Sequence, residues 1–296
     1  MEAKKNNLAR GVFWNGQVQA AAFLATDAVN ESIRLHDLSP LAAAALGRGL
    51  MGAAFLGLNL KGGDSVTLRI KGDGPIGGLL AQATSGGRLR GYVGNPGVEL
   101  PLNEAGKLDV GGAIGREGYL YVSKDLGMKE PYTGTSELIS GEIAEDLAHY
   151  FYQSEQTPAA VSLGVLIDVD RSCRAAGGFI IKALPGVDEA KLAGLEDWLS
   201  VLPPISSLAD QLRDPEEMLR ALFPQEEPEA LTLESWRLVC ECDRKRLEKA
   251  LISLGREELA DMIENDGKAE LRCQFCNKAY DFSKEDLEAL FAEAKE

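Results

Sequence analysis

The sequences Cys240-Glu241-Cys242 and Cys273-Gln274-Phe275-Cys276 contain four of the five cysteines of this chain. Two close cysteine pairs on either side of a domain-sized insert, here residues 243–272, are typical of structural zinc sites in which four thiolates surround one Zn²⁺. The same thiols can also leave a metal as disulfides. The spacing therefore predicts a small C-terminal domain, residues 235–296, that binds one zinc ion through Cys240, Cys242, Cys273 and Cys276.

The composition is ordinary for a globular protein, but the charge is unevenly distributed. The chain has 296 residues, 45% hydrophobic and 26% charged, which predicts more than one compact unit. Residues 1–186 have 17 basic and 19 acidic residues (net −2), and residues 187–296 have 14 and 27 (net −13), which together give the formal charge of −15. An acidic surface repels polyanions, so no nucleic-acid partner is expected.

No targeting or membrane segment is predicted. Polar residues interrupt the N-terminal stretch after Lys4 and Lys5, so a signal peptide is not expected. The apolar stretch 41–60 contains Arg48 and Asn59 and is interpreted as a buried helix, with no membrane partner. Paired thiols in a leaderless chain favour a reducing cytoplasm, where such cysteines usually bind metal.

Residues 1–186 are predicted to form a strand-rich α+β core domain. Ser39-Pro40 begins an Ala/Leu-rich helix, and residues 140–143 begin a second, amphipathic helix. Strands are expected at 65–70, 79–84, 118–122, 161–169 and 178–184, because these segments alternate or are bounded by turn residues. No regular βαβ repeat is present, so a doubly wound sheet is not expected.

Residues 187–234 are predicted to form an acidic helical linker with a weak hold on its neighbours. The segment has 12 acidic and 3 basic residues, and prolines interrupt its helical patterns. It is too short to build much core alone, so its apolar stripes need a surface to cover; an ordinary two-helix connector is the alternative interpretation. The stripes comprise Leu192, Leu195, Trp198, Leu199, Met218, Leu219, Leu222 and Phe223.

Residues 235–296 contain few apolar residues besides the cysteines. One helix is expected before Gly255, and Asp266-Gly267 is expected to turn into a strand that leads to Cys273. Ser283 is expected to begin a last helix, with Phe282 and Leu287 in contact across its first turn. Because this module is short, the metal should supply a decisive share of its stability.

Other motifs do not indicate catalysis. Gly72-Asp73-Gly74-Pro75-Ile76-Gly77 fits a dinucleotide-binding pattern, but the segment after it is too short for the required helix and predicts a hairpin. His36 and His149 are far apart in sequence, and Cys173 is interpreted as an isolated buried thiol, although the neighbouring Arg174 could lower its pKa. No catalytic residues are assigned, and the chain is not expected to be an enzyme.

The whole pattern resembles the heat-shock protein 33 family, the redox-regulated chaperones of mainly bacterial cytoplasm. The resemblance spans nearly the entire chain, and both cysteine motifs fit the family without departure. The stretches that carry the resemblance are Lys124-Asp125-Leu126-Gly127, Glu130-Pro131-Tyr132-Thr133-Gly134, Ser140 to Ala148 (SGEIAEDLA), Ser154-Glu155-Gln156, residues 72–77 and Arg90-Gly91-Tyr92-Val93.

This resemblance implies an ATP-independent holdase that protects unfolding and oxidatively damaged proteins from aggregation during stress. It implies that the reduced, zinc-bound protein is inactive, and that oxidants form the disulfides Cys240–Cys242 and Cys273–Cys276, expel zinc and allow a homodimer to form. With the linker stripes it leads to the hypothesis that unfolding of the linker creates the site for client proteins.

Two other classes of function remain open at this point. A thiol–disulfide oxidoreductase could use Cys273 and Cys276, although such enzymes usually place a CxxC motif in a βαβ unit, which this sequence lacks. A static zinc-dependent adaptor would bind a partner protein and would lose its function on oxidation. Turnover of a disulfide substrate would indicate the first class, and loss of function on oxidation would indicate the second.

Overall fold

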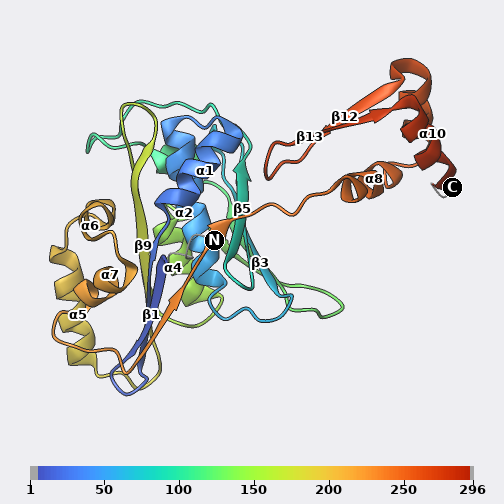
Figure 1. Ribbon diagram of the computed structural model, residues 1–296. Helices are drawn as coiled ribbons and strands as arrows, with labels where there is room; N and C mark the ends of the chain where they lie inside the picture. Colours follow the sequence, from blue (N-terminus) through green and yellow to red (C-terminus); the bar gives the residue numbers. More distant parts are fainter. Residues whose placement is uncertain (1–5, 294–296) are drawn as a thin grey trace. The chain divides into compact units, whose positions relative to one another are not determined.

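The structure is a computed structural model that describes residues 6–293. The chain divides into two compact units, of which the first extends through Val239 and the second begins at Cys240 (Figure 1). The first unit contains two sheets with helices between them, and the second contains a two-stranded sheet with helices. The predicted α+β class, with a strand-rich N-terminal part and four cysteines gathered near the C-terminus, is confirmed.

Sheet A of the first unit has five antiparallel strands in the order β10-β1-β2-β9-β8. Sheet B has six strands in the order β11-β5-β4-β3-β6-β7, of which only the short β11–β5 pair is parallel. The strands of sheet A are β1 (Leu8–Phe13), β2 (Val18–Leu24), β8 (Ala159–Ile167), β9 (Cys173–Ala183) and β10 (Ala230–Glu234). Those of sheet B are β3 (Ser65–Lys71), β4 (Leu79–Thr84), β5 (Arg88–Val93), β6 (Tyr119–Asp125), β7 (Tyr132–Glu137) and β11 (Arg237–Leu238).

A helical layer fills the space between the two sheets (Figure 1). Its centre is α2 (Pro40–Leu56), which begins as predicted, since the Ser39 hydroxyl accepts a hydrogen bond from the Ala42 amide at 3.1 Å. Gly49 lets the helix approach sheet B, because a Cβ there would lie 2.6 Å from the Leu79 side chain. The other helices of the first unit before the linker are α1 (Thr26–His36), α3 (Val110–Ile114) and α4 (Ala144–Gln153).

Helix α4 depends on one buried carboxylate at its start. Asp146 is fully buried, and its side chain accepts hydrogen bonds from the amides of Ile139 (2.8 Å), Ser140 (3.1 Å) and Ile143 (2.9 Å). These bonds hold the turn that precedes the helix and satisfy donors at its N-terminal end. The motif in residues 140–148 therefore has a structural role in this protein.

The acidic segment predicted as a linker covers the second face of sheet A. It forms α5 (Glu189–Val201), α6 (Ile205–Leu212) and α7 (Pro215–Leu222), which pack on strands β1, β2, β8 and β9 in a second hydrophobic cluster. It also ends in strand β10, which was not predicted and which pairs with β1. The division into residues 1–186, 187–234 and 235–296 stays a prediction; in the structure residues 187–239 belong to the first compact unit.

The glycine-rich stretch 72–77 is a tight connection between β3 and β4 and opens no helix, as expected. A Cβ at Gly72 would lie 2.2 Å from the backbone oxygen of Ile114, and one at Gly74 would lie 2.3 Å from that of Ala113. The two glycines are therefore required by the close approach of the chain to the end of α3.

The second unit is a small layer of helices on a hairpin. Ser283 begins its last helix as predicted, because its hydroxyl accepts from the Asp286 amide and the Asp286 carboxylate accepts from the Ser283 amide. Phe282 and Leu287 are both buried beside this turn. The elements are α8 (Arg244–Ile252), α9 (Arg256–Asp261), a π-helical turn (Met262–Asp266), β12 (Lys268–Arg272), β13 (Ala279–Ser283) and α10 (Lys284–Glu293).

Among residues 6–293, no helix is long and apolar enough to cross a membrane. The apolar helix α2 has 17 residues, and its side chains belong to the core between the sheets.

Candidate metal centre

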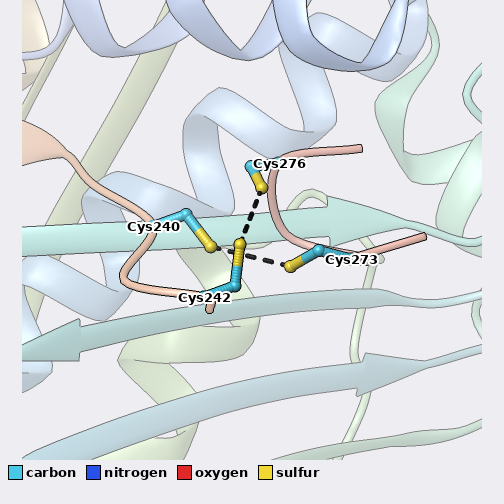
Figure 2. A group of neighbouring side chains, drawn as sticks. All are labelled: Cys240, Cys242, Cys273 and Cys276. Atoms are coloured by element: carbon cyan, nitrogen blue, oxygen red, sulfur yellow. Dashed lines mark hydrogen bonds between the residues drawn. The ribbon is translucent and has the colours of Figure 1, made fainter. Parts of the chain in front are cut away.

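Two separate turns of the second unit bring the four cysteines together (Figure 2). Cys240 and Cys242 lie in the extended segment before α8, and Cys273 and Cys276 lie in the connection between β12 and β13. The second turn is closed by two backbone hydrogen bonds, one from the Asn277 amide to the Cys273 oxygen (2.8 Å) and one from the Cys273 amide to the Lys278 oxygen (3.0 Å). This turn directs both of its thiols to the same side of the hairpin.

The arrangement of the sulfurs suits a tetrahedral zinc ion. All four Sγ atoms lie within 4.8 Å of one another. The Sγ atoms of Cys240 and Cys273 are 3.6 Å apart, and those of Cys242 and Cys276 are 3.3 Å apart. A Zn–S bond of about 2.3 Å in a tetrahedral site corresponds to sulfur–sulfur distances of about 3.8 Å. The donor set and the spacing therefore fit one Zn²⁺ with four thiolates and no open position.

The surroundings of Cys240, Cys242 and Cys276 shift the pKa values of these three thiols in different directions. Burial raises the pKa of Cys240 and of Cys276. The pKa of Cys242 is lowered to about 7, because hydrogen bonds from Tyr280 and from the other three thiols outweigh the opposing effect of burial. Of these three thiols, Cys242 therefore ionises most readily when no cation is bound. A divalent metal at its centre would deprotonate all four sulfurs.

Tyr280 supports the cluster from strand β13. Its hydroxyl lies 3.3 Å from Cys242 Sγ and 3.0 Å from the Cys242 backbone oxygen, so its single hydrogen can be donated to either atom. Its ring is buried in the core of the module. Tyr280 was not identified from the sequence, although the alternation Ala279-Tyr280-Asp281-Phe282 after Cys276 indicated a strand with Tyr280 on the buried face.

Cys173 lies apart from this group, at the start of β9 in the first unit. Its side chain is buried in the core between the sheets, and burial raises the pKa of the thiol to about 12. The neighbouring Arg174 forms an ion pair with Asp210 at 2.7 Å. Arg174 therefore does not activate Cys173.

The apolar side chains proposed to bind clients lie beneath and within the three outer helices. Met218, Leu219, Leu222 and Phe223 are buried against sheet A, and Phe223 stacks on Phe13 with ring centroids 4.0 Å apart. On α5, Leu195 is buried, whereas Leu192 and Leu199 are half-buried and Trp198 is 37% exposed. The structure thus places these residues in one helical layer, and their role as a client site stays a prediction.

Trp198 joins α5 to α7 at the edge of a shallow hollow. Its indole nitrogen donates to the Ala221 backbone oxygen at 3.0 Å. The hollow has a volume of about 320 Å³, and Trp14, Leu195, Trp198, Leu222 and Phe223 are among the residues that line it. Trp14 was not identified from the sequence because it lies in the β1–β2 turn, far from α5 along the chain.

Together, the two-sheet first unit with its acidic helical cover and the second unit with four converging thiols define a two-unit protein whose smaller unit could hold a metal ion. Comparison with known proteins assigns it to a family. Residues 6–283 match the family described as Hsp33 protein. Similar proteins include the 33 kDa chaperonins of Halalkalibacterium halodurans, 45% identical over 97% of this chain and 99% of that protein, and of Bacillus subtilis, 46% identical over 96% and 97%.

The solved structures agree with this assignment. The crystal structure of the 33 kDa chaperonin (heat shock protein 33 homolog) of Thermotoga maritima matches with a TM-score of 0.91 and 40% identity over 97% of this chain and 98% of that one. The chain belongs to the Hsp33 family.

Proposed function

We propose that this chain is a redox-regulated chaperone, an ATP-independent holdase that binds unfolding and oxidatively damaged proteins and is not an enzyme. Membership of a family whose relatives are named 33 kDa chaperonin supports the chaperone activity. The observation that carries the redox regulation is the approach of four thiols to within 4.8 Å of one another in a small compact unit of their own. In the reduced protein, Cys240, Cys242, Cys273 and Cys276 bind one Zn²⁺ per chain and the chaperone is inactive.

Oxidation forms the disulfides Cys240–Cys242 and Cys273–Cys276. Each disulfide forms when two thiolates give up two electrons to an oxidant. With hydrogen peroxide, the O–O bond breaks and the two oxygens take two protons from solvent to become two water molecules. The sulfurs that become bonded no longer carry the negative charge that binds zinc, so the ion leaves. The two short sulfur contacts, Cys240···Cys273 and Cys242···Cys276, each join one cysteine of the first motif to one of the second. The proposed disulfides join cysteines of the same motif, so the cluster must rearrange before they form.

Loss of zinc then affects the outer layer of α5, α6 and α7 through the segment that connects this layer to Cys240. Strand β11 and Val239 are held on β5 by backbone hydrogen bonds from Arg237 to the Gly87 oxygen and from Val239 to the Leu89 oxygen, and the next residue is Cys240. When the module unfolds, this short attachment loses the order at its C-terminal end. The acidic layer of α5, α6 and α7 loosens next and exposes apolar side chains among many carboxylates, which lets the surface bind unfolded chains and stay in solution.

The proposal also places the protein in the cytoplasm and includes a homodimer in the activated state. Its clients are unfolded or partly folded proteins, and no membrane takes part. These assignments rest on the family and on the reducing environment that zinc-bound thiols require.

The test follows zinc and client aggregation together. Peroxide treatment at raised temperature should release about one zinc per chain to a colorimetric chelator. Light scattering of a thermally unfolding client should fall at the same rate, and a reductant should reverse the effect. Zinc release without suppression of aggregation would contradict the proposal and indicate a static zinc-dependent adaptor, and turnover of a disulfide substrate would indicate an oxidoreductase.

A pair of variants tests the role of the helical layer. Trp198→Gln combined with Leu222→Gln removes the contact between α5 and α7 and puts a polar group into the buried cluster, so it should suppress aggregation without oxidant. Val201→Gln is the matched control, since Val201 lies on the same helix and is 70% exposed. Unchanged latency of the double variant would show that the layer is not the client site.

A further inference from the structure

The outward face of sheet B contains a compact group of aromatic and basic side chains that the chaperone proposal does not use. Strands β3 and β6 alternate, so that Leu68, Ile70 and Leu120 are fully buried toward the helices. Arg69 and Tyr121 occupy the positions between them and point to the other side of the sheet. This surface belongs to sheet B, whereas α5, α6 and α7 cover a face of sheet A.

The register of β3 and β6 brings the group together. Arg69 lies directly opposite Tyr121, and Lys71 lies directly opposite Tyr119. The two tyrosine rings lie with centroids 6.1 Å apart and planes inclined at 46°. Tyr119 is 45% exposed, and Arg69 and Lys71 are exposed. Two rings and two cations thus occupy four adjacent positions on one surface.

More cations follow on the neighbouring strands of the same face. Arg88 and Arg90 alternate with the buried Leu89 on β5, and Arg237 pairs with Arg88 in the register of β11. The Arg90 Nε donates to the Gln82 side chain at 2.7 Å, which orients the guanidinium along the sheet. Five basic residues therefore occupy outward positions on this sheet, with Arg88 and Arg237 at the end opposite to Lys71.

Two carboxylates lie on this face. Asp125 is opposite Ser65 at the end of β6, and Glu137 is directly opposite Tyr119 on β7, next to one of the two rings. The central row across the sheet, Tyr92–Leu80–Arg69–Tyr121–Thr135, contains no acidic residue. Five basic and two acidic residues give this face a positive charge within a chain of formal charge −15.

Aromatic rings beside cations on an open antiparallel sheet match the chemistry of a single nucleic-acid strand. Its bases stack on aromatic side chains regardless of their sequence, and its phosphates interact with arginine and lysine. An acidic peptide would satisfy the cations but would provide no flat ring for Tyr119 and Tyr121. We propose that the outward face of sheet B binds single-stranded nucleic acid, with stacking on these two tyrosines and phosphate contacts to Arg69 and Lys71.

This proposal differs from the expectation drawn from net charge. That expectation rests on residues 187–296, with a net charge of −13, whereas residues 1–186 have a net charge of −2. The local field of a surface, more than the total charge, decides whether a polyanion approaches it. The proposed site uses neither the cysteines nor the outer helices, so it is independent of the chaperone proposal.

The experiment is fluorescence anisotropy of a labelled oligo(U) of about 20 nucleotides with the full-length, reduced, zinc-loaded protein at about 50 mM salt. Binding should be saturable and should weaken with salt. An abasic strand of the same length should bind roughly tenfold more weakly, because it keeps the phosphates and lacks the bases. No saturable binding, or equal affinity for the two strands, would overturn the proposal.

Variants separate stacking from charge. Tyr121→Leu should weaken binding of oligo(U) roughly tenfold, while Tyr121→Phe should keep it and show that the sheet tolerates the change. Arg69→Gln should lower the slope of log affinity against log salt by about 0.7. Arg171→Gln, in the β8–β9 turn of sheet A, is the matched control and should have no effect. Two results would overturn the assignment of this face: equal losses of affinity in Arg69→Gln and Arg171→Gln, or unchanged binding in Tyr121→Leu. Stronger binding of an acidic peptide than of oligo(U) would also overturn it and would indicate a protein partner.

Discussion

The two units of this protein are held together in different ways. In the first unit, a continuous cluster of buried side chains runs from Leu8 to Trp236 and joins both sheets to α2, and a second cluster lies beneath α5, α6 and α7. In the second unit, six buried residues form the core of a module with fewer than sixty residues. Domains of this size bury too little apolar surface for more than marginal stability.

The difference explains how one protein can combine a durable fold with a switch. The first unit keeps its structure through apolar burial and buried hydrogen bonds such as those of Asp146, and neither responds to redox conditions. The second unit adds four thiols to a small core, and the zinc ion proposed to bind them would supply the stability that the core lacks. If the small core depends on zinc, loss of the ion should unfold the second unit and leave the first unit folded. Changes made in either unit can test this difference.

Removal of zinc should have the largest effect. A strong chelator under reducing conditions should remove a contribution of about 10–16 kcal/mol to folding of the module, more than the total stability of most small domains. We expect amide protons of β12 and β13 to exchange freely, while those of β3 and β4 stay protected, as measured by hydrogen exchange with mass spectrometry. Addition of zinc should restore protection, and protection of β12 that persists without zinc would show that the core of the module is sufficient.

A substitution in the first unit should lower the stability of that unit and leave the metal site of the second unit intact. Asp146→Ala leaves the amides of Ile139, Ser140 and Ile143 without their acceptor in a buried site. The loss should lower the free energy of unfolding of the first unit by about 3 kcal/mol, because bonds to a buried charged acceptor are among the stronger ones. Denaturant unfolding followed by circular dichroism measures this change.

Zinc content, measured by native mass spectrometry, should be unchanged in Asp146→Ala. Asp146→Asn keeps one oxygen acceptor and should have a smaller effect. If the variant loses zinc as well as stability, the two units fold as one, and they are not stabilised independently of each other.

The sequence predicted the local parts of this structure well. The β4–β5 hairpin with its Ser85-Gly86-Gly87 turn, the start of α2 at Ser39 and the start of α10 at Ser283 each follow from residues close together in the sequence. The convergence of the four cysteines followed from their spacing, because two short thiol pairs have few geometries other than a shared site.

The parts that were not predicted depend on contacts between distant segments. Strands β1 and β2 were not identified, and β10 lies in a segment interpreted as helical. Strand β10 pairs with β1 across more than two hundred residues, with Arg10 opposite Thr232. None of its five residues is fully buried, so their sequence shows little alternation of apolar and polar residues. Pairing with the edge of β1 determines their conformation.

The smallest effect concerns the fifth cysteine and contrasts it with the other four. Burial raises the pKa of Cys173 to about 12, and the Asn30 amide group holds its backbone through bonds of 2.8 Å and 2.9 Å. Iodoacetamide reacts with thiolates, so Cys173 should stay unmodified in the folded protein at neutral pH. After chelation of zinc, the four cysteines of the module should be modified, and mass spectrometry of tryptic peptides distinguishes the two groups. Early modification of Cys173 would mean that the first unit opens together with the module.

The same thiol should give the first unit a dependence on alkaline pH. Because the pKa of Cys173 is raised in the folded state from an ordinary value of 9.0 to about 12, the unfolded chain releases this proton first as the pH rises. Its contribution to stability is therefore complete below pH 9 and is lost progressively between pH 9 and about 12. Cys173→Ala removes this dependence, at a cost of about 1 kcal/mol for the lost sulfur contacts. Urea unfolding at several pH values gives the free energy of unfolding of both proteins, and the difference between them should shrink above pH 9. A constant difference would show that the pKa of the thiol is the same in the folded and unfolded protein.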